Sequence, residues 1–135
     1  MLKCTVLVLA IFGMSLIKAM PEEMRELAEM LHNTCVTETG VDEDIVTNAI
    51  NGDFSTDESF KSYLKCLMDQ MACISDDGNV DVEAIIALIP ENIRDKAAPI
   101  IRKCGSEKPA ARLLDTIWNF HICCLNTDPT TYFLF

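Results

Sequence analysis

Hydrophobic residues recur at intervals of three and four along most of the chain, a spacing typical of amphipathic α-helices rather than strands. The first such segment covers about residues 21–37, where one stripe carries apolar side chains: Met24, Leu27, Ala28, Leu31 and Cys35. Glutamates gather in its first turns, where they suit the positive end of the helix dipole. We expect Gly40 to end this helix.

Two further helices are predicted before residue 75. One follows Asp42 and ends at Asn51 and Gly52, residues that accept the left-handed conformation of a helix C-terminus. Its apolar positions are Ile45, Val46, Ala49 and Ile50. Ser55 and Glu58 have the spacing of a capping box, so we expect the next helix to begin there. Its apolar positions are Phe60, Leu64, Leu67 and Met71.

The acidic segment 76–79 predicts a turn, after which Asp81 can cap a fourth helix that ends before Pro90. This helix would bury Val82, Ile85, Ile86 and Ile89. A fifth helix is predicted over 91–103. Pro99 lies inside it and should kink or split it, because proline cannot donate a backbone hydrogen bond.

The last helix is predicted over about 109–125 and is apolar nearly all the way round. Its apolar residues are Leu113, Leu114, Ile117, Trp118, Phe120 and Ile122. A helix with so little polar surface lies at the centre of a fold. The tail at 130–135 is also apolar and costly to leave in water, so we expect it to fold back over the interior. The sequence therefore predicts an all-α, compact bundle of six short helices.

Residues 1–19 have the architecture of a secretory signal peptide. Lys3 precedes an apolar run over 5–17, no acidic residue is present, and Ala19 is a suitable cleavage edge. The run is shorter than the roughly 20 residues that span a bilayer, and no other run approaches that length, which argues against stable membrane association. We therefore expect a secreted, extracellular protein whose mature part is one domain, residues 20–135.

The chain is strongly acidic, with 21 Asp and Glu against 11 Lys and Arg and a net charge of −10. Loss of the signal peptide would remove two lysines and no carboxylate. Such a surface repels phosphate backbones and anionic lipid, which excludes nucleic acid as a partner. It favours a monomer, or at most a weak homodimer.

The acidic turn does not fit a calcium-binding EF-hand loop. With Gly78 at the sixth loop position, Cys73 and Ala84 occupy the first and twelfth positions, where carboxylates are needed. The turn is better explained as a solvated loop followed by a helix cap. We predict no metal site and no cofactor.

The segment 121–124, His-Ile-Cys-Cys, shares residue types with secreted phospholipases A2, but in that family the paired cysteines precede the histidine and an aspartate follows it. His32 and His121 are the only histidines, and neither G-x-S-x-G nor H-E-x-x-H occurs. The sequence therefore predicts no enzyme. We expect His121 to be a structural or pocket-lining residue.

Methionines and aromatic residues are numerous enough either to fill an ordinary core or to line a cavity. Six short helices, one of them encircled by the others, and an adaptable methionine-rich interior suit a buried pocket for a small apolar molecule. We predict that Trp118 lies in or beside this pocket, with Met68, Ile86 and Phe120 as further walls. Tyr132 and Phe133 of the tail would cover it.

Residues 60–68, FKSYLKCLM, followed by DDGNVD at 76–81, resemble the centre of insect odorant-binding proteins of the pheromone and general odorant-binding type. The similarity extends over the whole mature chain. That family has a pair of cysteines separated by three residues, of which only Cys66 is present, and Ser62 replaces the other. Leu114 stands where the family has another cysteine, if its last cysteine is Cys123.

The two missing cysteines are partners in the family, so the chain is similar to the Minus-C subgroup of odorant-binding proteins. The resemblance implies two bonds, Cys35 with Cys66 and Cys104 with Cys123, although the adjacent Cys124 leaves the last partner open by one residue. Cys73 and Cys124 could be free and buried, or form a substitute third bridge.

The resemblance also implies a non-enzymatic, disulfide-bonded bundle around an apolar ligand pocket. Our leading hypothesis is a secreted carrier for a small hydrophobic ligand such as an odorant or pheromone, with a chemosensory receptor as a possible second partner. The alternative is a secreted structural or signalling protein whose interior is filled. Stoichiometric binding of a hydrophobic fluorescent probe would distinguish the two.

Overall fold

The fold is seen in a computed structural model that describes residues 22–134. Six α-helices follow one another along the chain: α2 (Glu22–Thr39), α3 (Glu43–Ile50), α4 (Glu58–Gln70), α5 (Val82–Leu88), α6 (Glu91–Gly105) and α7 (Leu113–Thr127). Within residues 22–134, the only β-type backbone pairing is a single bridge between Ile74 and Val80. The predicted all-α fold is therefore confirmed. The expected signal peptide, residues 1–19, lies outside the described residues.

Side-chain caps begin three of the helices, α3, α4 and α5. Asp42 and Asp81 cap α3 and α5, as predicted. In α4 the cap is Asp57, whose Oδ1 accepts a hydrogen bond from the Ser59 amide at 2.9 Å. Ser55 instead accepts the Asp57 amide at 3.0 Å, so the capping box expected at Ser55 is wrong. The cap of α4 is therefore the Asp57 carboxylate, two residues after Ser55, and it accepts a hydrogen bond from a free amide of the first turn.

The last two helices differ in part from their predictions. α6 is continuous through Pro99, so the predicted split is absent; this residue lies on the exposed face, where the carbonyl that loses its partner can bind water. α7 begins four residues after the expected start at Pro109. The backbone of Arg112 is still extended, and its guanidinium binds the Glu58 carboxylate through two 2.7 Å hydrogen bonds. This ion pair holds the linker against α4.

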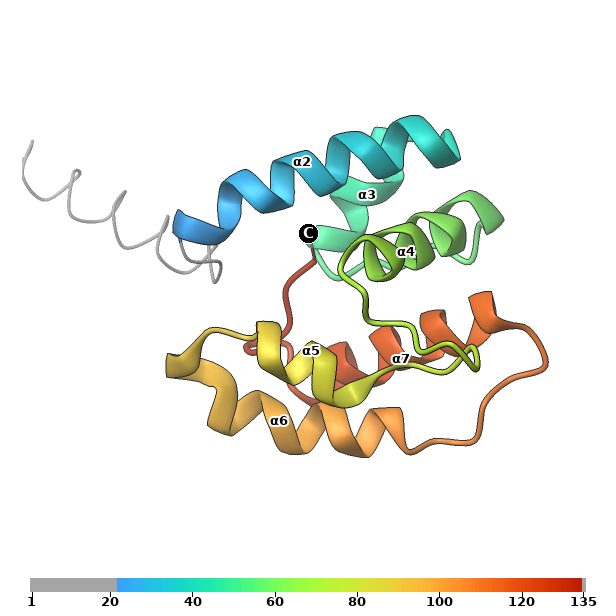
Figure 1. Cartoon of the computed structure of the whole chain (residues 1–135). Helices are drawn as coiled ribbons and strands as arrows, with labels where there is room; N and C mark the ends of the chain where they lie inside the picture. The colour runs from blue at the N-terminus through green and yellow to red at the C-terminus, as the bar shows by residue number, and fades with distance from the viewer. Residues whose placement is uncertain (1–21, 135) are drawn as a thin grey trace, which may run out of the picture.

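Figure 1 shows two groups of helices, with α2, α3 and α4 on one side and α5, α6 and α7 on the other. Contacts join α2 to α4, α4 to α7, α6 to α7, and α5 to α6. α7 therefore packs against both groups, which agrees with its nearly all-apolar sequence. After α7 the chain turns back, and the tail crosses the space between the two groups (Figure 1).

The hydrophobic core has two parts that match the two groups. The first contains Phe60, Tyr63 and Leu64, each without exposed surface, together with the tail residue Leu134. The second consists of buried residues from α5, α6 and α7: Ile86, Ala97, Ala98, Ile101, Cys104, Phe120 and Cys124. Leu27 and Ile50, two residues of the predicted apolar stripes, are 38% and 60% exposed.

Two disulfides connect the helices, Cys35 with Cys66 and Cys104 with Cys123. This is the pairing that the family resemblance implies. The first joins α2 to α4, and the second joins α6 to α7. Cys73 and Cys124 are free and buried, so the structure has no third bridge between them.

Candidate functional site: an apolar cavity at the junction of the two helix groups

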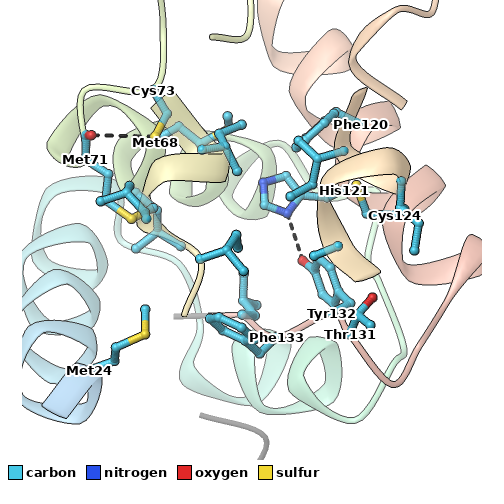
Figure 2. Close-up of a pocket in the computed structure, with 18 residues that line it drawn as sticks. Met24, Met68, Met71, Cys73, Phe120, His121, Cys124, Thr131, Tyr132 and Phe133 are labelled. Atoms are coloured by element: carbon cyan, nitrogen blue, oxygen red, sulfur yellow. Dashed lines mark hydrogen bonds between the residues drawn. The ribbon is translucent and has the colours of Figure 1, made fainter. Parts of the chain in front are cut away.

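An apolar cavity lies between the two parts of the core, and the chain's tail forms one of its walls (Figure 2). Side chains from α2, α4, α5, α6, α7 and the tail contribute to it. The lining residues are Met24, Leu67, Met68, Met71, Cys73, Ile85, Leu88, Ile89, Ala97, Ile100, Ile101, Phe120, His121, Cys124, Thr131, Tyr132, Phe133 and Leu134. The space that centres of water molecules could occupy in it is about 100 Å³. Such a lining suits a small apolar molecule.

Four of the six residues predicted for a ligand site lie at this cavity: Met68, Phe120, Tyr132 and Phe133. The tail thus runs over the interior, as its apolar sequence suggested. Ile86 does not line the cavity but is buried in the second part of the core. Trp118 does not line it either.

Trp118 lies on a different face of α7 from the cavity residues. At 100° per residue it stands about 110° around the helix from the centre of the face formed by Phe120, His121 and Cys124. Its indole Nε1 donates a hydrogen bond to the Ser55 carbonyl at 2.8 Å, and Lys61 Nζ lies 5.9 Å from its ring centroid. Trp118 therefore fixes α7 against the start of α4.

Several lining residues were not identified from the sequence. Met71 and Leu67 were expected on the apolar face of the third helix, and Met71 lies three positions after Met68, so helical spacing could have assigned both to the wall. Leu88 and Ile100 carried no such signal, because a periodic pattern shows that a residue faces the interior without showing where the interior is empty.

His121 is the polar residue of the cavity wall with the most unusual surroundings. Its Nδ1 lies 2.8 Å from the Tyr132 hydroxyl, and the dashed line in Figure 2 marks this hydrogen bond. Its Nε2 is buried and has no hydrogen-bond partner among the described residues. Burial lowers the pKa of His121 to about 4, so the ring is neutral at pH 7. The expectation that His121 lines a pocket agrees with this geometry.

The two free cysteines also line the cavity. Burial, assisted by Asp81, raises the pKa of Cys73 to about 11. Burial, assisted by Glu107, raises the pKa of Cys124 to about 12. Both side chains are therefore protonated thiols at neutral pH and behave as small apolar groups.

A second hollow lies beside the turn that follows α6, and its volume by the same measure is about 270 Å³. Although it is larger, six of its lining side chains are polar: Asn79, Ser106, Glu107, Lys108, Thr116 and Asn119. Such a hollow is well suited to water. We therefore assign the candidate ligand site to the smaller, apolar cavity.

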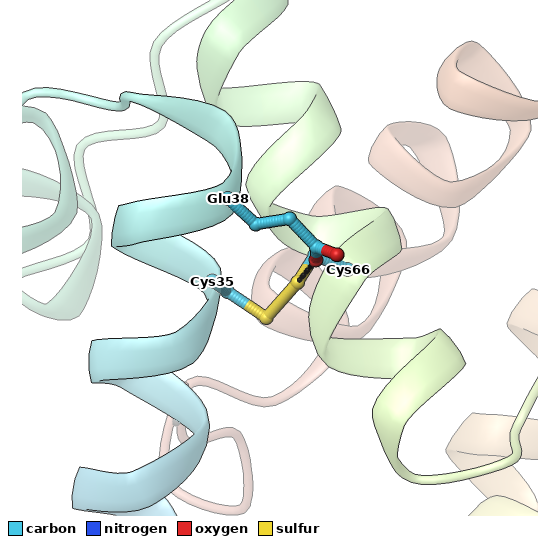
Figure 3. Close-up of side chains that lie close together, drawn as sticks. All are labelled: Cys35, Glu38 and Cys66. Carbon is cyan, nitrogen blue, oxygen red and sulfur yellow. Dashed lines mark hydrogen bonds between the residues drawn. A yellow bond between two sulfur atoms is a disulfide. The ribbon is translucent and has the colours of Figure 1, made fainter.

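Cys35, Glu38 and Cys66 lie close together on α2 and α4, as Figure 3 shows. Glu38 Oε2 is 2.9 Å from Cys66 Sγ. The two sulfurs form a disulfide, however, so neither offers the thiolate that binds a metal ion. This group is therefore a disulfide with a neighbouring carboxylate.

None of the helices within residues 22–134 combines the length and apolar character that crossing a membrane requires.

Comparison with known proteins agrees with this fold. The model of the PBP/GOBP family matches residues 18–127. The B1 protein of Tenebrio molitor is 25% identical over 118 residues, which are 86% of this chain and 89% of that protein.

Solved structures share the same fold. Odorant binding protein 5 of Apis mellifera has a TM-score of 0.78 at 19% identity, over 87% of this chain and 99% of that one. The fatty acid binding protein OBP56a from the oral disk of the blowfly Phormia regina has a TM-score of 0.63 at 21% identity, over 83% and 97% of the two chains.

Proposed function

The chain belongs to the PBP/GOBP family, and on this premise we propose that it is a secreted carrier that encloses a small hydrophobic molecule. The observation that carries the proposal is the cavity between the two parts of the core, whose walls are almost entirely apolar and include residues of the tail. Affinity would come from the burial of apolar surface, at about 25 cal/mol for each Å² removed from water. No bond is made or broken in this function.

The names of the similar proteins support the same class of ligand. One is an odorant binding protein and another is a fatty acid binding protein. For this chain we propose odorants, pheromones or related semiochemicals as the ligands. The alternative is a structural or signalling protein with a filled core. That alternative does not account for an unfilled apolar cavity between five helices and the tail.

A pair of neighbouring alanines in α6 provides a sharp test. Ala97 and Ala98 are both buried, but only Ala97 lines the cavity. The wild-type chain should bind one molecule of a hydrophobic probe such as N-phenyl-1-naphthylamine. Ala97→Leu should weaken this binding at least tenfold, because added carbons occupy the cavity. Ala98→Leu is the control for overpacking and should lower the melting temperature without a comparable loss of affinity.

If the probe does not bind stoichiometrically to the folded wild-type protein, the filled-core alternative is correct. If Ala98→Leu weakens binding as much as Ala97→Leu, the probe binds somewhere else. Circular dichroism of each variant establishes that it is folded.

We also propose that the protein is secreted after removal of residues 1–19. N-terminal sequencing of protein recovered from extracellular fluid should then begin at or near Met20. An intact N-terminus on the functional protein would contradict this. A chemosensory receptor as partner, and a monomeric or weakly dimeric state, remain predictions that receptor assays and analytical ultracentrifugation can test.

A further inference from the structure

One buried nitrogen atom in the cavity wall makes no hydrogen bond within the described part of the chain. Among the buried side-chain nitrogen and oxygen atoms of residues 22–134, His121 Nε2 alone lacks a hydrogen-bond partner. An unpaired buried polar group destabilises the folded chain. His121 belongs to the cavity lining, and Figure 2 shows this nitrogen on the side of the ring away from Tyr132. A ligand in the cavity could therefore supply the missing partner.

Tyr132 determines what this nitrogen can offer. The Tyr132 hydroxyl has His121 Nδ1 as its hydrogen-bond partner, at 2.8 Å. If the hydroxyl donates to Nδ1, both of those atoms are satisfied, and the ring hydrogen must be on Nε2. If Nδ1 donated instead, the hydroxyl hydrogen and Nε2 would both lack partners. The first arrangement leaves fewer unpaired groups, so Nε2 carries a hydrogen and is a donor.

The surroundings of the donor restrict the chemistry of its acceptor. The other residues that line the cavity are apolar apart from Thr131, Tyr132 and two protonated cysteines, and no cationic side chain is among them. A carboxylate in this space would be a buried charge without a counter-ion, which is costly. A carbonyl or hydroxyl oxygen would accept the bond from Nε2 without that cost.

We propose that His121 is the polar anchor of the cavity and selects apolar ligands that carry one uncharged oxygen acceptor, such as ketones, esters or alcohols. This inference rests on the proposed carrier function, and it adds the chemical class of the ligand. Tyr132 is the positioning residue that fixes the hydrogen on Nε2. Burial of apolar surface supplies the affinity, and the hydrogen bond from His121 distinguishes ligands that carry an oxygen acceptor from those that do not.

The binding test uses four competitors with equal numbers of non-hydrogen atoms: octane, 2-heptanone, 1-heptanol and hexanoate. Each displaces N-phenyl-1-naphthylamine from the wild type and from the double variant His121→Phe/Tyr132→Phe, which removes the polar pair but keeps two rings. The preference for 2-heptanone over octane should fall about fivefold to tenfold in the double variant, which corresponds to one net hydrogen bond of about 1–1.4 kcal/mol. His32→Phe/Tyr63→Phe removes a similar hydrogen-bonded pair outside the cavity and should leave the preference unchanged.

An unchanged preference in the variant His121→Phe/Tyr132→Phe would overturn the inference, and so would an equal loss caused by His32→Phe/Tyr63→Phe. Hexanoate binding at pH 7 as tightly as 2-heptanone would overturn the selection for uncharged groups. If no competitor displaces the probe, or if the probe does not bind, the carrier function itself fails. The two proposals can thus fail separately.

A second measurement needs no variant. Nitrogen NMR of the wild-type protein labelled at its histidines should show His121 as a neutral ring with its hydrogen on Nε2, and 2-heptanone should shift that N–H signal. His32 is the internal control, because both of its ring nitrogens are already bonded, to Tyr63 and to Glu43, each at 2.8 Å. A hydrogen on Nδ1 of His121, or an N–H signal that ignores the ketone, would contradict the assignment.

Discussion

Lys61 Nζ lies 2.8 Å from Asp115 Oδ1, and this ion pair joins α4 to α7 beside the two positions where the family has a disulfide. The Lys61 side chain is only 16% exposed. Hydrogen bonding to Lys61 lowers the pKa of Asp115. Ser62 and Leu114 are the sequence neighbours of this pair, and both are partly buried. Non-covalent contacts therefore hold these helices together where a bridge is missing.

We predict that Ser62→Cys/Leu114→Cys forms a disulfide and raises the melting temperature. The bond would close a loop of about 50 residues, worth about 4 kcal/mol in the chain-entropy model. Differential scanning calorimetry before and after reduction measures the gain, and the two single variants are the controls. A double variant that forms the bond but melts no higher would show that the wild-type helices are already held as firmly.

Trp118 should be a poor reporter of ligand binding. Its indole hydrogen bond to Ser55 and its position off the cavity face separate it from a bound molecule. We predict that saturation with an apolar ligand leaves its emission maximum unchanged. A matched reporter, Phe133→Trp in a Trp118→Phe background, places the indole on the lining and should respond. A large shift of Trp118 emission in the wild type would place the ligand elsewhere.

The helical pattern predicted six elements and their approximate limits, because apolar periodicity and aspartate caps are local properties. It failed where distant residues decide the outcome. Arg112, the extended residue before α7, pairs with Glu58, which lies 54 positions earlier. Trp118 and Phe120 are equally apolar in the sequence, but only the packing of α7 shows which of them faces the cavity.

The parts of the candidate site that could be predicted came from two strong features of the sequence, its apolar tail and its family resemblance. The apolar tail implied a cover, and the family resemblance implied the disulfide partners. The unpaired state of His121 Nε2 could not be predicted, because it depends on which side chains surround the ring once α7 has packed and the tail has folded back.

The free thiols should resist modification in the native protein. The pKa of Cys73 is raised to about 11 and that of Cys124 to about 12, so little thiolate is present near pH 8, and both side chains are buried. We predict no alkylation by iodoacetamide in buffer and two additions per mature chain in guanidinium, measured by intact mass. Absence of both additions after unfolding would indicate a third disulfide.

The tail should contribute to both binding and folding. Leu134 is 8% exposed and belongs to the first part of the core, so deletion of 131–135 removes core as well as cover. Phe133→Ala separates the two effects, because Phe133 lines the cavity and is only partly buried. We predict that this variant binds the hydrophobic probe about tenfold more weakly, with less loss of unfolding free energy than Leu134→Ala. Equal losses of both quantities in the two variants would contradict the role of the tail as a cover.

The stability of the protein should fall in mildly acidic solution because of His121. Its pKa is lowered from the ordinary 6.5 to about 4 by burial, so between these values the unfolded chain binds a proton that the folded chain does not. The free energy of unfolding therefore decreases as the pH falls through this window, by about 2 kcal/mol between pH 7 and pH 5.

Urea unfolding of the wild type and His121→Phe at both pH values checks this contribution. At pH 7 the two proteins should differ little in stability, because the variant removes the unpaired Nε2 but leaves the Tyr132 hydroxyl unpaired. At pH 5 the variant should be the more stable of the two by about 2 kcal/mol, since phenylalanine binds no proton. Carboxylates whose pKa is lowered, such as Asp57 and Asp128, are common to both proteins and cancel in the difference. A stability difference that is the same at both pH values would mean that His121 is accessible to protons in the folded state, and that its ring is not held neutral by the cavity wall.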